Sequence, residues 1–258
     1  IGFNHLGSYR IAKKMITAAH KAGVDAVKFQ TYVPEEMVFK SSPHFKSIKN
    51  TTLTENEYKN LRKIAKSLQL DFLSTPFDKL SYDLLKRVNV DSLKIASMDL
   101  NNFQLLNYIK NFKKTIFLST GMANITEIKK SYNFLKKYNK NIFLLHCISK
   151  YPTDEKDANI DFLNKLKKIS GKNIGFSDHT LTNVSSMIAV NHGARIIEKH
   201  FTFNKKLKGA DNKNSLDTDE MIKFVKDLKI IRDVKRDFYK NKRPDEYQKK
   251  SFRRYFFA

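Results

Sequence analysis

An apolar run in the last quarter of this 258-residue chain ends in ionisable side chains. The run RIIEKHF begins at residue 195 as a buried strand would, and then carries Glu198, Lys199 and His200 in a row. Side chains alternate along a strand, so Glu198 and His200 share a face. The preceding run, NIGFSDH, pairs Ser177 with His179 in the same way. Both runs therefore indicate strands whose cores give way to a site.

Two imidazoles at neighbouring strand ends could bind a divalent metal. His179 and His200 end adjacent predicted strands, so their rings could converge to the ligand distance of ~2.1 Å. Two imidazoles leave coordination positions for water and substrate oxygens, which is typical of a catalytic metal. A lone His is more often a hydrogen-bonded structural residue. The metal hypothesis therefore depends on the two rings meeting.

Lysines and hydroxyls end the other apolar runs and are typical of a site for phosphate or carboxylate. A Ser or Thr at a strand end also commonly caps the next helix, and a lone Lys there can extend to solvent. The concurrence of two lysines, several hydroxyls and two histidines favours a functional site. The polar strand-end residues are Lys28, Gln30, Ser74, Thr75, Lys94, Ser97, Ser119, Thr120, His146, Ser177 and His179.

Eight short β-rich runs alternate with segments of helical spacing, and this alternation predicts the fold. Thr54 and Thr218 are expected helix caps, and Gly23 an expected stop. Parallel strands with helical crossovers are implied, and eight units favour a closed (β/α)8 TIM barrel over a doubly wound open sheet. In such a barrel the strand ends converge on one mouth. The predicted strands are residues 1–5, 25–30, 71–76, 92–97, 115–120, 141–147, 173–179 and 195–201.

Two segments depart from the alternation. Residues 31–53 form a long insert that we expect to serve the site as a lid or wall. Residues 241–258 are polar and contain Pro, so we expect residues 1–240 to form the barrel domain and the remainder to be a linker. No apolar run approaches the ~20 residues that cross a bilayer, and we expect a soluble protein.

The composition suggests an anionic partner. The chain has 49 Lys and Arg against 26 Asp and Glu, a formal net charge of +23. This excess would suit nucleic acid, but the lysines are spread through nearly every helical segment rather than gathered in a stripe. We therefore expect no nucleic-acid function, and the charge favours a small anionic substrate. Cys147 is the only cysteine; we expect it to be a buried apolar residue in a cytoplasmic protein.

The order of the motifs resembles that of the sialic acid synthase family. The shared motifs are DAVKFQ, FLSTPFD, LKIASMDL, FLSTGM, LLHCISKYPT, GFSDHT, EKHFT and KGADNKNSLD, and they span nearly the whole chain. These enzymes condense phosphoenolpyruvate with an N-acyl amino sugar, giving a nine-carbon 2-keto acid and phosphate. The resemblance implies a (β/α)8 barrel, a homodimer and a C-terminal antifreeze-like domain beyond residue 258.

The resemblance also implies roles for particular residues. Asp99 stands where relatives carry a Glu near the reacting centre, and the other implied catalytic residues, Lys28 and Lys94, would neutralise the phosphate and carboxylate of the substrate. The implied ligands of Mn2+ or Mg2+ are His179 and His200. The implied sugar-binding residues are Gln30, Tyr151 and Asp211. The implied phosphoenolpyruvate site comprises Lys28, Thr75, Lys94, Ser97, Ser119 and Ser177.

Several activities stay open from the sequence. N-acetylmannosamine is the first-choice acceptor, and a legionaminate or pseudaminate synthase is the alternative. A Schiff-base class I aldolase is more distant, with Lys28, Lys94 and Lys199 as candidate nucleophiles. That mechanism predicts trapping by borohydride and no need for a metal. A phosphosugar-binding barrel without catalysis would bind substrate but release no phosphate.

Overall fold

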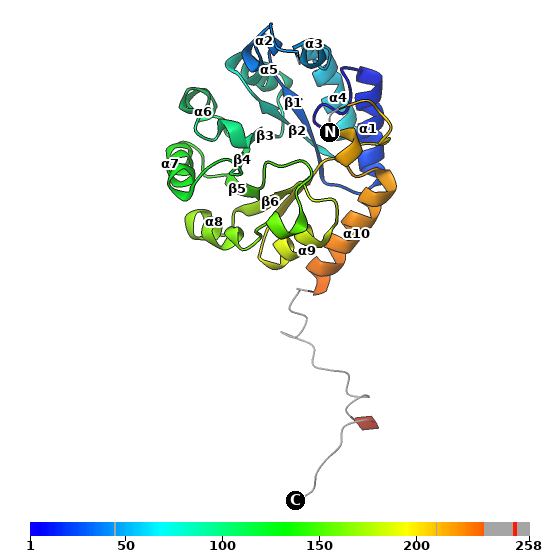
Figure 1. The fold of residues 1–258 in the computed structure, drawn as a ribbon, viewed down its shortest axis with the longest axis vertical. Helices are drawn as coiled ribbons and strands as arrows, with labels where there is room; N and C mark the ends of the chain where they lie inside the picture. The colour runs from blue at the N-terminus through cyan, green and yellow to red at the C-terminus, as the bar shows by residue number, and fades with distance from the viewer. Residues whose placement is uncertain (44, 210, 235–249, 252–258) are drawn as a thin grey trace, which may run out of the picture.

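A curled parallel sheet surrounded by helices forms the protein (Figure 1). The computed structural model describes residues 1–43, 45–209, 211–234 and 250–251. In these residues seven strands pair in chain order, each parallel to the next, so every connection crosses the outside of the sheet. The fold is of the TIM-barrel type, as predicted. The strands are β1 Ala26–Thr31, β2 Asp71–Pro76, β3 Ser92–Ile95, β4 Thr115–Ser119, β5 Ile142–Cys147, β6 Ile174–Asp178 and β7 Ile196–Lys199.

Each strand-to-strand connection carries helix, and the expected helical segments all appear. Thr54 caps α4 with a capping box, in which its Oγ1 accepts from Glu57 N at 3.3 Å. The helices are α1 Tyr9–Lys21, α2 Pro34–Met37, α3 Phe45–Lys49, α4 Glu55–Ser67, α5 Lys79–Val88, α6 Phe103–Ile109, α7 Ile125–Lys136, α8 Phe162–Ser170, α9 Val184–Asn191 and α10 Thr218–Val234, with 3₁₀ turns η1 Ser97–Asp99, η2 Glu155–Asp157 and η3 Asn212–Asn214.

One predicted cap is wrong. Asp217, not Thr218, caps α10, because its Oδ1 accepts from Glu220 N at 3.0 Å while Asp217 N donates back to the Glu220 carboxylate at 2.9 Å. A carboxylate is at least as good a cap as a hydroxyl, and a Glu three residues later completes the reciprocal pair. The expected stop is confirmed, since Gly23 follows α1 with a φ of 77°.

The predicted first strand, residues 1–5, is wrong. Gly2 alone pairs, in a parallel bridge with Phe29 of β1, and its φ of 55° turns the chain out of the extended conformation. The segment still lies between β1 and β7, because Asn4 Nδ2 donates to the carbonyl of Phe201, just beyond β7, at 2.9 Å. In the described residues no ladder joins β7 to β1. A buried side chain spans this seam instead.

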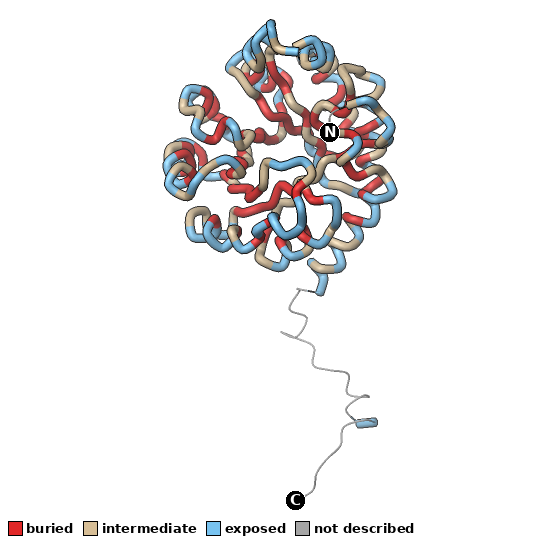
Figure 2. The backbone as a smooth tube through the Cα atoms, in the orientation of Figure 1, coloured by how far each residue is buried: buried red, intermediate tan, exposed pale blue. Residues whose placement is uncertain are grey.

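The hydrophobic core lies between the outer face of the sheet and the inner faces of the helices (Figure 2). Phe29 and Phe72, from β1 and β2, stack with ring centroids 5.1 Å apart. Tyr58 of α4 packs edge-on against both rings. These rings fill the outer layer, which leaves the opposite face of the same strands free to carry polar groups.

The predicted insert, residues 31–53, contains the short helices α2 and α3. Its two ends are tied together, since Tyr32 Oη donates to the carbonyl of Ile48 at 3.1 Å. Val33 N donates to the carboxylate of Asp78 at 2.8 Å, which anchors the insert to the start of α5. The predicted domain boundary at residue 240 lies outside the described residues, as does the linker of residues 241–258 apart from residues 250–251.

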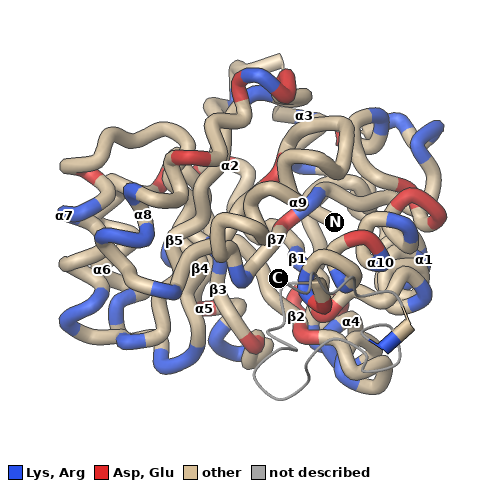
Figure 3. Tube along the Cα trace, turned by 90° about the horizontal axis from the view of Figure 1, so that it is seen from below, with Lys and Arg blue, Asp and Glu red and all other residues tan. Residues whose placement is uncertain are grey.

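The basic residues lie on many elements of the molecule. In Figure 3 Lys and Arg are scattered over the outer helices rather than gathered along one groove. Within the described part of the chain, none of the helices combines the length and apolar character needed to cross a bilayer.

Candidate active site

The strand register places the polar strand-end residues on one face of the sheet. Gln30 pairs with Thr75, Cys147 with Ser177, and Ser177 with Glu198. Parallel register partners point to the same side, and residues two apart on a strand do so as well. In a curled sheet whose other face packs on helices, this side is the lumen. The lumenal set comprises Lys28, Gln30, Thr75, Lys94, Ser119, Cys147, Ser177 and Glu198.

Glu198 is the centre of a charged cluster in the lumen. Lys94 Nζ lies 2.8 Å from Oε1 and 2.9 Å from Oε2, and Ser177 Oγ donates to Oε1 at 2.7 Å. Lys28 Nζ lies 3.7 Å from the same Oε1. Burial alone would raise the pKa of Glu198, but the ammonium groups of Lys28 and Lys94 outweigh it and hold this pKa well below its usual value. Glu198 is therefore a carboxylate at neutral pH.

Lys28 is the less constrained of the two lysines. Its distance to Glu198 exceeds that of a hydrogen bond, so this ion pair leaves its ammonium donors for an incoming anion. Burial lowers the pKa of Lys28, and the nearby carboxylate of Glu198 opposes that shift. Two ammonium groups against one carboxylate leave a net positive charge in a partly buried lumen. Such a site suits a small anion.

The two predicted metal ligands do meet. The rings of His179 and His200 have centroids 5.4 Å apart at an interplanar angle of 74°. The Nδ1 of His179 donates to the carbonyl of Ile148 at 2.6 Å, and the Nδ1 of His200 faces the carboxylate of Asp211 at 3.3 Å. An acceptor at Nδ1 places the ring hydrogen there and leaves the lone pair on Nε2.

The electrostatics keep His179 neutral. Burial, and next the proximity of His200, lower the pKa of His179 to about 4. Neutral imidazole is the metal-binding form. The described residues contain no group of three or more His, Cys, Asp or Glu side chains able to hold a metal. The donor set is therefore a pair of imidazoles, which fits an open site whose other ligands are water and substrate and does not fit a closed structural site.

The predicted sugar residues border the histidines. The ring of Tyr151 lies 4.1 Å from that of His179, and Tyr151 is half exposed, so it stands at the mouth. Asp211 contacts His200 directly. A Cβ placed on Gly2 would lie 3.3 Å from Gln30 Oε1 and 3.9 Å from Asp211 Oδ2, so the residue-1–5 segment brings these two side chains close together. Gln30 Oε1 is buried and has no partner within the described residues.

Other predicted residues lie nearby without joining the charged cluster. Thr75 and Ser119 are buried on the lumenal face, and Ser119 Oγ has no hydrogen-bond partner among the residues described. Ser97 Oγ lies 3.1 Å from the sulfur of Cys147 and accepts from Gly121 N at 3.1 Å. Cys147 is buried, as expected. These hydroxyls line the lumen beside the charged cluster.

Asp99 lies in the turn η1 after β3. Asn102 Nδ2 donates to its Oδ1 at 3.0 Å, while its buried Oδ2 has no partner in the part of the chain that is described. Burial raises the pKa of Asp99. No hydrogen bond or ion pair of the described residues joins Asp99 to Lys94 or Glu198. Asp99 therefore lies at the strand ends but outside the charged cluster.

Three polar strand-end residues have structural roles instead. Ser74 points to the helix side, with its Oγ 2.8 Å from that of Thr31. Thr120 Oγ1 donates to a β5 carbonyl at 3.1 Å. His146 Nε2 donates to the carbonyl of Ala158 at 2.8 Å, and its ring stacks in the outer layer. The two hydroxyls bond to neighbouring strands and do not cap the next helix, while His146 has the hydrogen-bonded structural role that is common for a lone His.

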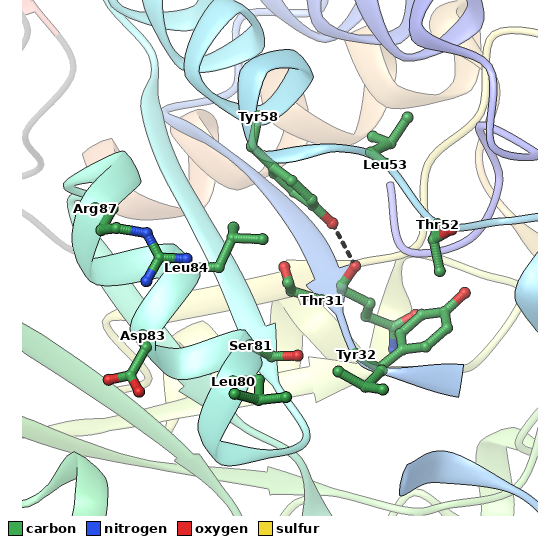
Figure 4. Close-up of a pocket in the computed structure, with 12 residues that line it drawn as sticks. Thr31, Tyr32, Thr52, Leu53, Tyr58, Leu80, Ser81, Asp83, Leu84 and Arg87 are labelled. Atoms are coloured by element: carbon green, nitrogen blue, oxygen red, sulfur yellow. Dashed lines mark hydrogen bonds between the residues drawn. The ribbon is translucent and has the colours of Figure 1, made fainter. Parts of the chain in front are cut away.

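A cavity of about 260 Å3 lies outside the lumen, between α4, α5 and the two ends of the insert (Figure 4). Tyr58 Oη, one of its lining groups, donates to the carbonyl of Gln30 at 2.7 Å. Arg87 at its edge pairs with Glu55 at 2.9 Å. A smaller hollow of about 10 Å3 lies between Tyr151 and the two histidines. The smaller hollow is lined by both imidazoles, Tyr151 and Asp211, so it marks the imidazole end of the candidate site, and Lys28, Lys94 and Glu198 lie deeper in the lumen outside its lining.

The NeuB family model matches residues 15–240. The chain belongs to the NeuB family. The resemblance drawn from its motifs is thereby confirmed. NeuB-family synthases are phosphoenolpyruvate-dependent condensing enzymes, and the lumen described above is the part of this NeuB chain that offers both cations and imidazoles.

The names of similar proteins specify different nine-carbon sugar acids as products. The N,N'-diacetyllegionaminic acid synthase of Legionella pneumophila is 35% identical over 247 residues, covering 88% of this chain and 69% of the relative. The pseudaminic acid synthase of Campylobacter jejuni is 34% identical over 237 residues, covering 86% and 69%. The solved N-acetylneuraminic acid synthetase of Leptospira borgpetersenii superposes with a TM-score of 0.89 at 33% identity, covering 98% of this chain and 90% of that one.

Sequence reasoning gave Glu198 no role in this NeuB site. The signal was present, since alternation along EKH puts Glu198 on the same face as His200. The partners of Glu198 were not foreseeable, because Lys94 lies on β3 and Lys28 on β1, and neither strand is a neighbour of β7 in the ladder. Contact across a lumen depends on how tightly the sheet curls.

Proposed function

We propose that this NeuB-family chain condenses phosphoenolpyruvate with an N-acyl amino sugar to a nine-carbon 2-keto acid and releases phosphate. N-acetylmannosamine is the first-choice acceptor, which would give N-acetylneuraminate. The observation that carries the proposal is the continuity of the site. Ser177 Oγ lies 2.7 Å from the Glu198 carboxylate and 3.5 Å from His179 Nε2, so it links the charged cluster to the imidazole pair.

The two lysines of the charged cluster, Lys28 and Lys94, would hold the phosphate and carboxylate of phosphoenolpyruvate. Lys28 offers ammonium donors that its ion pair leaves uncommitted, and Lys94 is fixed in place by Glu198. Fixed cations align an anion without the cost of reorganising at the moment of reaction. The hydroxyls that would complete the cradle are Thr75, Ser97, Ser119 and Ser177.

His179 and His200 would hold a divalent cation, Mn2+ or Mg2+, through their Nε2 atoms. When bound, such an ion supplies Lewis-acid polarisation of a sugar aldehyde oxygen. Tyr151, Asp211 and Gln30 would orient the sugar at the mouth, since they lie beside the two imidazoles. The hydrogen bonds at both Nδ1 atoms hold the rings in the orientation that binding requires.

The reaction balances with these residues. C3 of phosphoenolpyruvate forms the new bond to the aldehyde carbon, whose oxygen takes up a proton. Water adds at C2 and loses a proton, and the resulting tetrahedral carbon expels phosphate by cleavage of its C–O bond. Asp99 is the proposed proton carrier, because its buried Oδ2 has no hydrogen-bond partner among the described residues and burial raises the pKa of its carboxyl.

Phosphate release is the direct test. The full-length protein would be incubated with phosphoenolpyruvate, Mn2+ and a panel of N-acyl sugars in 18O-labelled water. We expect phosphate without label, and label in the 2-keto acid, because the C–O bond is the one that breaks. His200→Asn should abolish turnover, while His192→Asn, which alters a partly exposed His paired with Asp161, should not. Absence of phosphate release with every sugar would refute the proposal.

A Schiff-base aldolase is the second candidate activity. The lowered pKa of the buried Lys28 amine favours it, because a neutral amine is the nucleophile. Lys199 drops out as its nucleophile, since it lies on the outer face and pairs with Asp178 at 2.9 Å. Borohydride would trap a substrate on this enzyme, and EDTA would have no effect. The synthase predicts the opposite behaviour in both experiments.

The acceptor and the partner chains are further parts of the proposal. An acceptor of the legionaminate or pseudaminate pathway is the alternative, and the panel of N-acyl sugars distinguishes it from N-acetylmannosamine.

A homodimer with a C-terminal antifreeze-like domain is proposed because exposed apolar side chains surround the mouth, among them Met98, Met122 and Leu181. A cytoplasmic location is proposed from the unpaired Cys147.

A further inference from the structure

Strands β6 and β7 carry a second charged pair on the face opposite the lumen. Asp178 and Lys199 are register partners, and Lys199 Nζ lies 2.9 Å from Asp178 Oδ2. Their side chains are 0% and 4% exposed, which makes this pair more buried than the lysines of the lumen. The next residue on each strand is a predicted metal ligand, His179 on one and His200 on the other.

Both partners of this pair have their hydrogen-bonding positions filled. The Asp178 carboxylate accepts from Thr180 N and Thr180 Oγ1, each at 2.8 Å, and from Ser186 Oγ at 2.6 Å. Lys199 Nζ donates to the carbonyls of Thr180 and Thr182 at 2.6 and 3.2 Å. The pair thus ties β7 both to β6 and to the loop that follows His179.

We propose that Asp178 and Lys199 form a positioning pair that fixes the register of β6 and β7 and thereby brings His179 and His200 together. A slip of one residue would turn one histidine out of the lumen, because side chains alternate between faces. It would also leave two buried charges unpaired. Setting register against alternatives is the best-attested role of a buried polar pair.

The direction in which Lys199→Met changes the affinity for Mn2+ distinguishes a positioning role from a purely electrostatic one. Lys199 is a cation beside the proposed cation site, so an electrostatic role alone predicts that Lys199→Met binds Mn2+ more tightly than the wild type. A positioning role predicts weaker binding. Lys199→Met leaves Asp178 with its three other donors, but it breaks a buried pair on one side, so we also expect it to lower the stability of the fold.

The experiment measures Mn2+ binding by electron paramagnetic resonance in the full-length protein. We expect Lys199→Met to raise the Kd for Mn2+ at least tenfold. The matched control is Arg62→Met, which removes a cross-element pair with Asp91 of 3.3 Å near the start of β3 and leaves Asp91 bonded to Phe72 N. The control should bind Mn2+ as the wild type does. Unchanged or tighter binding by Lys199→Met would overturn the proposal.

Amide hydrogen exchange tests the register without any metal. Because the inference rests on the proposed metal site, failure of the wild-type protein to bind Mn2+ would count against that site and not against the register. Lys199→Met should lose protection selectively in residues 174–178 and 196–199, while Arg62→Met should keep it there. Equal protection in all three proteins would overturn the proposal. Should Lys199→Met not fold, Asp178→Asn, which keeps the side-chain shape, takes its place in both measurements.

Discussion

Lys94 and Glu198 face each other across the lumen from β3 and β7, two strands that do not pair, with Nζ 2.8 and 2.9 Å from the two carboxylate oxygens. The backbone connects these two strands only through the ladders of β4, β5 and β6, so the side-chain pair adds a direct brace across the lumen. The same two groups lie where phosphoenolpyruvate is proposed to bind. Stability and activity are therefore coupled at this pair.

Lys94→Met should show that coupling. The change leaves Glu198 with Ser177 and the more distant Lys28, and breaking a buried pair on one side costs roughly 3–5 kcal/mol. The side chains of Lys94 and Glu198 are 5% and 17% exposed, so solvent screens the pair weakly. Urea unfolding would measure the lost stability, and phosphate release should disappear.

Lys66→Met is the control for the Lys94 variant. Its pair with Asp71 is 3.0 Å long with side chains 42% and 60% exposed, and its longer contact of 3.4 Å with Asp91 leaves that carboxylate paired with Arg62 when Lys66 is removed. Exposed pairs contribute about 0–1 kcal/mol, so this variant should unfold within that margin of the wild type and keep its activity. Equal destabilisation by the two substitutions would contradict the bracing role of Lys94.

Asp211→Asn should weaken metal binding without removing a ligand. Asp211 faces Nδ1 of His200 at 3.3 Å, and loss of such an outer partner typically costs 10- to 100-fold in metal affinity. Titration with Mn2+ would measure the Kd. Asp161→Asn is a matched control, since it removes the same kind of contact from the partly exposed His192, away from the site. Loss of affinity in both variants would indicate a general charge effect.

His5 should make the protein less stable in acid. It is fully buried against Phe29, its Nδ1 accepts from Gly7 N at 3.1 Å, and burial lowers its pKa to about 4. An unfolded His titrates near 6.5, so below that pH the unfolded chain binds the extra proton first. The stabilisation from this group is complete above pH ~6.5 and is lost as pH falls to about 4, a difference of about 3 kcal/mol.

The pH dependence of unfolding would test this assignment. His5→Gln cannot take up the proton, so its free energy of unfolding should fall less steeply than that of the wild type between pH 6.5 and 4. His20→Gln alters an exposed His of α1 and should leave the slope unchanged. Parallel slopes for wild type and His5→Gln would show that another group is responsible.

Gly175→Ala should force β6 and β7 apart. An added Cβ would lie 2.5 Å from Leu145 Cδ2 and 2.6 Å from the carbonyl oxygen of Ile196. The side chain can move and the backbone carbonyl cannot, so we expect a loss of about 1–3 kcal/mol in unfolding free energy. Adding Leu145→Ala relieves only the first contact. Amide hydrogen exchange of β6 in the double variant is the measurement. If β6 regained the protection of the wild type, the contact with the Ile196 carbonyl would be shown to be unimportant.

The sequence predicted most strands and the lumenal face because both depend on local alternation. Ser177, Glu198 and their neighbours needed only a period of two to be assigned a side. Residues 1–5 were mistaken for a strand because their apolar pattern does not reveal the positive φ of Gly2. Alternation also could not tell that Ser74 would pair with Thr31 on the helix side rather than in the lumen.

The histidine pair marks a different limit of sequence reasoning. Their convergence followed from adjacency of the last two strands, which chain order supplies. The acceptors at their Nδ1 atoms, the carbonyl of Ile148 and the carboxylate of Asp211, lie in loops whose paths no periodicity encodes. Loop residues were therefore identified only by resemblance.

The seam at Asn4, where no ladder of the described residues joins β7 to β1, bears on which substrates the barrel can accommodate. A wall that is continuous backbone pairing resists expansion, because several hydrogen bonds must break together. Here residues 1–5 close the wall, with Gly2 N donating to the carbonyl of Lys28 at 3.2 Å on the β1 side and the Asn4 amide donating to Phe201 O and Ser215 Oγ at 2.9 Å each on the β7 side. Widening the barrel there would break these few hydrogen bonds without breaking a ladder of the described strands, so the residues that flank Asn4 are a place where a larger substrate could be accommodated.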